Sequence, residues 1–168
     1  GGSQYSSVAG VALDRFFRSL GDRFEERSRA DISTPERIAA LRRAGEAYRL
    51  GGSSDRFAEV SVRSEQLTSE FERDREELNE SVAAAEGFLG QCADTCGDPV
   101  TAVTSHTVSV FGLYSDARTA SAEGSEAVRI AETHNLDQTE DLQSLAEESS
   151  STLLSLAIGS AIVVNRDN

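Results

Sequence analysis

A seven-residue repeat constrains this chain more than any other feature of its sequence. Two interleaved sets of mostly apolar or small residues run through positions 57–92: Phe57, Ser64, Phe71, Leu78, Ala85 and Cys92, with Val60, Leu67, Asp74, Ser81 and Phe88 between them. Such a repeat predicts one continuous helix with a narrow buried face, about 60 Å long at the rise of an α-helix. The polar positions Ser64, Asp74 and Ser81 argue against a simple dimeric coiled coil. They favour a helix packed within a bundle.

The residues before this segment predict two further helices. Apolar side chains recur at helical spacing and should face the core of a first helix ending near Arg29: Val8, Val11, Ala12, Phe16, Leu20 and Phe24. Thr34 followed by Pro35 is typical of an N-cap with proline at the first helical position. A second helix should therefore begin there.

Glycine and proline mark the remaining boundaries. Gly51 and Gly52 should end the second helix, because glycine accepts the left-handed backbone that closes a helix. The sequence CGDP at 96–99 should end the long helix and start another, from Pro99 to His134. Residues 137–140 (DQTE) have the pattern of a capping box and should open the last helix.

These segments predict an all-α fold. Small residues on the last two predicted helices should allow close approach: Ala120, Ala122, Gly124, Ser125 and Ser149 to Ser151. We expect residues 1–168 to form a single helical-bundle domain, an elongated antiparallel bundle of about four long helices plus one short helix.

The charge composition indicates a salty habitat. All 16 basic residues are arginine, and 29 acidic residues bring the net charge to −13. Weakly hydrated guanidinium groups and abundant carboxylates are typical of a halophile-like protein, although a GC-rich genome also favours arginine over lysine. Residues 1–75 hold 13 arginines and 13 acids, so residues 76–168 carry the whole net charge. Nucleic acid is excluded as a partner, because no basic patch with interleaved aromatic residues is present.

The two cysteines, Cys92 and Cys96, are a candidate disulfide. Their four-residue spacing places both thiols on one helix face, near the upper limit of the Cα distances that a disulfide spans. Two free thiols, or a metal or redox role, remain alternatives. A disulfide would indicate an oxidising compartment outside the cytoplasm.

Three other polar residues have candidate roles that the sequence leaves open. His106 and His134 lie on one predicted helix, too far apart for a shared metal or catalytic site, so we expect both to be structural. Asn79 begins a glycosylation sequon, Asn79-Glu80-Ser81, and should point outward. We expect no metal and no cofactor.

Several classes of enzyme are excluded by missing residues. Without lysine there is no P-loop lysine and no Schiff-base chemistry. The chain also lacks a nucleophile elbow, a zinc-protease helix and a dinucleotide-binding glycine motif. We therefore expect no catalytic residues and no enzymatic activity.

The function expected from these features is interaction with protein. We expect an extracytoplasmic surface, envelope or assembly-interaction domain of a halophile-like organism or its virus, with a protein partner or a second copy as ligand. The apolar run at 153–164 is too short to cross a bilayer, which takes about twenty residues, but it suits a position beside a membrane. The alternatives are the ligand-sensing four-helix bundle of a membrane receptor and an acidic protein that mimics polyanions.

The charge excess predicts that salt stabilises the fold. At molar salt the Debye length falls to about 3 Å, so repulsion among the uncompensated carboxylates is screened. Thermal melts in dilute buffer and in molar KCl should show a clearly higher Tm at high salt. A Tm that does not change with salt would contradict the halophilic interpretation.

Overall fold

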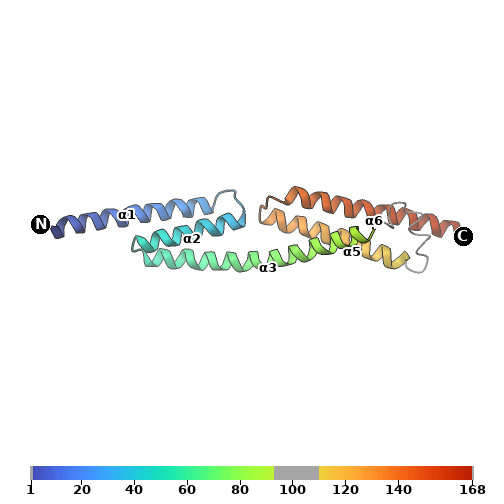
Figure 1. The fold of residues 1–168 in the computed structure, drawn as a ribbon, viewed down its shortest axis with the longest axis horizontal. Helices are drawn as coiled ribbons and strands as arrows, with labels where there is room; N and C mark the ends of the chain where they lie inside the picture. Colours follow the sequence, from blue (N-terminus) through green and yellow to red (C-terminus); the bar gives the residue numbers. More distant parts are fainter. Residues whose placement is uncertain (1, 93–109, 168) are drawn as a thin grey trace. The chain divides into compact units, whose positions relative to one another are not determined.

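All regular secondary structure in the described part of the chain is α-helical. A computed structural model describes residues 2–92 and 110–167 (Figure 1). Its elements are α1 (Gly2–Ser28), α2 (Thr34–Leu50), α3 (Ser54–Cys92), α5 (Val110–Thr133) and α6 (Thr139–Asp167), and these ranges contain no strand. The predicted all-α helical bundle is confirmed. None of the described helices has the length and apolar content that crossing a membrane requires.

The helices form two compact units, residues 1–73 and 74–168, and the boundary lies within α3. In the first unit, α1 and α2 form an antiparallel hairpin that packs with the first part of α3 (Figure 1). In the second unit, the last part of α3 packs with α5 and α6, which also run antiparallel. That both units fold as a single cooperative domain stays a prediction.

The repeat along α3 is the buried face of that helix. Of its eleven positions only Phe57 is exposed, at 37%, whereas the others are buried or half-buried. Val60 packs with Leu41 and Tyr48 in the first unit. Leu78 packs with Ile130 in the second. The predicted narrow, partly polar stripe is therefore confirmed.

The start of α2 corrects one detail of the sequence prediction. The N-cap is Ser33, not Thr34, which occupies the first helical position. Ser33 Oγ accepts from the Glu36 amide at 3.4 Å, and Glu36 Oε2 accepts from the Ser33 amide at 3.3 Å. This capping box outweighs the Thr34-Pro35 signal, because it satisfies two free amides reciprocally.

A residue with a left-handed backbone conformation follows the end of each of α2 and α5. Gly52, with φ +69°, closes α2 as predicted, and the Ser53 amide donates to the Tyr48 carbonyl at 2.9 Å. Asn135, with φ 50°, plays the same part after α5, where the Leu136 amide donates to the Ala131 carbonyl at 2.9 Å. Both ends have the hydrogen bonds of a Schellman motif.

The apolar face predicted for the first helix is wrong over its first half. Val8, Val11 and Phe16 are 69%, 58% and 59% exposed, and Ala12 is exposed as well. The reason is the length of α2, whose C-cap Gly51 lies against Asp14 and Arg18 of α1. Val8, Val11 and Ala12, which precede Asp14, therefore extend past the helix that would bury them, whereas the length of α2 does not account for the exposed Phe16.

Small residues set the distance between helices, as predicted for α5 and α6. A Cβ added at Gly124 would lie 3.0 Å from Ala146 Cα, and the Ser121 and Ser150 hydroxyls are 3.0 Å apart. Between α1 and α2, a Cβ at Gly21 would lie 2.6 Å from the buried Tyr48 ring. Glycine at these two positions lets the backbones approach closely.

A pair of glycine substitutions tests this packing. Gly124→Ala should lower the free energy of unfolding by about 1–3 kcal/mol, because the new methyl group overpacks against backbone. Gly87→Ala, with nothing within 4 Å of the new Cβ, should instead raise it by about 0.5–1 kcal/mol through helix propensity. Urea unfolding measures both. Equal stabilisation by the two substitutions would contradict the close α5–α6 contact.

Candidate functional site

The candidate disulfide is described on one side only. Cys92 is buried at the end of α3 and packs with Phe88, Ala117 and Leu156. Cys96 lies outside the described residues, as does His106. The Cys92–Cys96 pairing stays a prediction.

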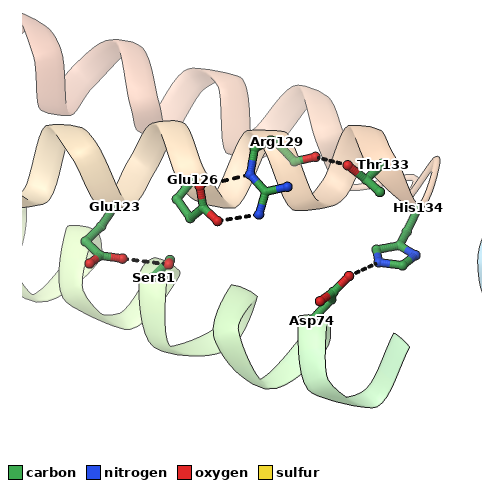
Figure 2. Close-up of polar contacts among 7 residues, drawn as sticks. All are labelled: Asp74, Ser81, Glu123, Glu126, Arg129, Thr133 and His134. Atoms are coloured by element: carbon green, nitrogen blue, oxygen red, sulfur yellow. Dashed lines mark hydrogen bonds and ion pairs between the residues drawn. The ribbon is translucent and has the colours of Figure 1, made fainter. Parts of the chain in front are cut away.

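The sequon residues point to different sides of α3. Asn79 is exposed, whereas Ser81 is 1% exposed and donates from Oγ to Glu123 Oε2 of α5 at 2.6 Å (Figure 2). The Ser81 hydroxyl, which completes the sequon, is therefore hydrogen-bonded within the contact between α3 and α5. Glycosylation of Asn79 stays a prediction, and modification would have to precede the folding of this unit.

His134 has a buried partner that its sequence position does not reveal. Its Nε2 lies 2.8 Å from Asp74 Oδ2 of α3, and the histidine is only 6% exposed (Figure 2). The pair explains why an aspartate occupies a core position of the repeat. The imidazole is enclosed between helices, and the pair joins the end of α5 to α3.

Two carboxylates meet on the surface next to this contact. A hydrogen bond to Glu126 raises the pKa of Glu77, with burial and the Glu126 charge acting in the same direction. The hydrogen bonds from Arg129 lower the pKa of Glu126, and Arg129 Nε donates to Glu126 Oε2 at 3.0 Å (Figure 2). Glu77 therefore takes up a proton at a higher pH than Glu126 does, because the guanidinium stabilises the charged form of Glu126.

A second polar network joins the three helices of the first unit. The fully buried Tyr48 donates its hydroxyl proton to Asp22 Oδ1 at 2.6 Å and accepts from Arg56 at 3.1 Å. Burial, followed by the hydrogen bond to Asp22, raises the pKa of Tyr48 to about 12. A phenol with so high a pKa remains protonated at neutral pH, so its function here is to connect helices.

Metal binding has no support in the described residues. Across 2–92 and 110–167, no three His, Cys, Asp or Glu side chains are grouped so that they could hold an ion. The polar contacts of Tyr48, Asp74 and Ser81 each link one helix to another.

Two exposed apolar surfaces stand out instead. The α1 patch consists of Val8, Val11, Ala12 and Phe16, and the α6 patch consists of Leu154, Ile158 and Ile162, which are 63%, 54% and 40% exposed. Each patch follows helical spacing along one side of its helix. On α6 this side is opposite the buried Ser149, Leu156 and Gly159.

The lack of charged residues in two segments marks these patches in the sequence, whereas the periodicity of apolar residues does not. Residues 1–13 and 149–165 contain no charged residue, in a chain that is 27% charged. Periodicity misses this signal, because an apolar face on a helix, such as the one predicted for the first helix, is usually assigned to the core.

The first unit also has two surface hollows. One of about 600 Å³ lies between α2 and α3 over Gly45, Ser61 and Thr68. Another of about 470 Å³ lies where Arg29, Arg37 and Arg63 converge. Their dimensions fall within the range of small-molecule sites.

No protein-family model, curated protein or solved structure matches the chain.

The raised pKa of Glu77 gives a pH-dependent prediction. Because the folded protein binds this proton more tightly than the unfolded chain, the folded state loses stability as the pH rises through this pKa. Glu77→Gln should therefore raise the Tm at pH 7 in low salt, and the gain should disappear below about pH 4 and in molar KCl.

Glu76→Gln is the matched control, because it removes one negative charge from an exposed neighbour on α3. Differential scanning calorimetry of both variants between pH 3 and 8 separates a local effect from the general charge excess. Equal gains from the two variants would show that Glu77 and Glu126 do not interact specifically.

Proposed function

We propose that this protein is a non-enzymatic assembly domain of an extracytoplasmic surface or envelope layer in a halophile-like organism or its virus. The observation that carries the proposal is the pair of exposed, charge-free apolar surfaces, the α1 patch and the α6 patch. Large contiguous apolar surfaces on a folded protein mark places of association.

The charge distribution favours a second copy of the chain as the partner. Two molecules of net charge −13 repel each other over most of their surfaces. That repulsion is weakest near the two patches, because residues 1–13 and 149–165 carry no charged side chain. High salt screens the remaining repulsion and strengthens apolar burial, so association should increase in the setting that the composition indicates.

The receptor-sensor alternative finds some support in the hollow between α2 and α3, whose hydroxyl-rich wall suits a small polar ligand. It requires flanking membrane segments in the longer gene product. The apolar patches require no such addition, so assembly is the preferred proposal.

Sedimentation of the purified protein in 2 M KCl tests assembly. We expect the wild-type protein to associate in a concentration-dependent way. Phe16→Glu or Ile158→Glu should each weaken this association by about tenfold or more, because the substitution removes an apolar side chain whose burial contributes about 1.5–3 kcal/mol. Val62→Glu is the control, since Val62 is 53% exposed on α3 outside both patches. A monomeric wild-type protein at all concentrations, or equal weakening by Val62→Glu, would refute the proposal.

A further inference from the structure

The hollow of about 470 Å³ in the first unit has an unusual lining for so acidic a protein. It forms where the end of α1, the first half of α2 and the middle of α3 meet. Three arginines, Arg29, Arg37 and Arg63, face a single carboxylate, Glu70. The lining therefore carries a net charge of +2 within a chain of net charge −13.

Two of these arginines have no carboxylate partner within the described ranges 2–92 and 110–167. Arg29 lies 3.5 Å from Glu25, its neighbour on α1. Among the described residues, neither Arg37 nor Arg63 forms an ion pair. Arg49 and Arg56 of the same unit, by contrast, form ion pairs with Glu46 and Asp22.

Arg37 also buries a donor without an acceptor. Its Nε has no hydrogen-bond acceptor among the described residues, although it is shielded from solvent by its surroundings. The Nη2 atom of the same group donates to the Ala30 carbonyl at 3.4 Å, which holds the guanidinium in place. Buried donors in proteins are nearly always satisfied, and a charged donor costs the most when it is not.

We propose that this hollow binds a tetrahedral oxyanion, a phosphate or sulfate group. Guanidinium groups match such oxygens in charge and geometry, and they can donate two hydrogen bonds from one plane. Arg37 Nε supplies the buried donor, Arg63 contributes a second guanidinium from α3, and Arg29 adds positive charge at the rim. Glu70 opposes an anion and limits the affinity. This site is separate from the α1 and α6 patches, so it does not depend on the assembly proposal.

Calorimetric melts at constant ionic strength test binding with potassium phosphate in place of part of the KCl. We expect phosphate to raise the Tm by about 3 °C at a concentration of about ten times Kd. Arg37→Gln and Arg63→Gln should each weaken phosphate affinity by about tenfold, the value of one charge-assisted hydrogen bond. Arg23→Gln, which removes an exposed arginine of α1 that does not line the hollow, should leave the phosphate shift unchanged.

Nitrogen-15 spectra of the arginine side chains locate the contact, because the Arg37 Nε–H resonance should move on titration with phosphate. Inorganic phosphate and phosphoserine then distinguish a free anion from a phosphoryl group on a larger molecule: equal affinities indicate that the site recognises the group alone. Equal Tm shifts with phosphate and chloride would overturn the proposal. So would a phosphate shift that survives in both Arg37→Gln and Arg63→Gln, or an Arg37 resonance that does not move.

Discussion

The buried face of α3 is the constraint on which the packing of both units depends. Tyr48 and Leu41 pack against it in the first unit, and α5 and α6 pack against it in the second. Its small and hydroxyl side chains leave room for close neighbours. Two of its polar positions are satisfied across the contact with the end of α5 and its middle, Asp74 by His134 and Ser81 by Glu123. Such buried pairs favour one register of α3 against α5, because a shifted register would leave charged or hydroxyl groups without partners.

Different regions of this protein's surface carry different charge, and each region suits a different kind of interaction. With 29 acidic and 16 basic residues, the chain has excess carboxylates that repel other copies over much of its surface. The segments 1–13 and 149–165, which contribute most of the α1 and α6 patches, lack charged side chains, and the lining of the arginine-lined hollow has the opposite sign. Arginine suits this hollow better than lysine would, because a weakly hydrated guanidinium can be partly buried while still directing several donors at one group.

Much of the fold could be predicted from patterns that are local in the chain. The repeat in α3, the stop at Gly52 and the small residues at the α5–α6 contact all describe what one helix requires of its own residues. The errors arose where local signals competed or where a partner was needed. Ser33 rather than Thr34 is the N-cap, because the Glu36 side chain completes a reciprocal pair of hydrogen bonds with it. The apolar face of α1 was misassigned because nothing in α1 records where α2 ends.

The sequence alone therefore determined the helices, their approximate limits and the charge character of the protein, because hydrophobic period, caps and composition act within a few residues. Only the tertiary structure decided which faces are covered and which polar groups meet. Asp74 and His134 are 60 residues apart, and the three arginines of the hollow come from three separate segments. Their meeting depends on helix lengths and on the close approaches at Gly21 and Gly124, which are properties of pairs of helices rather than of any one segment.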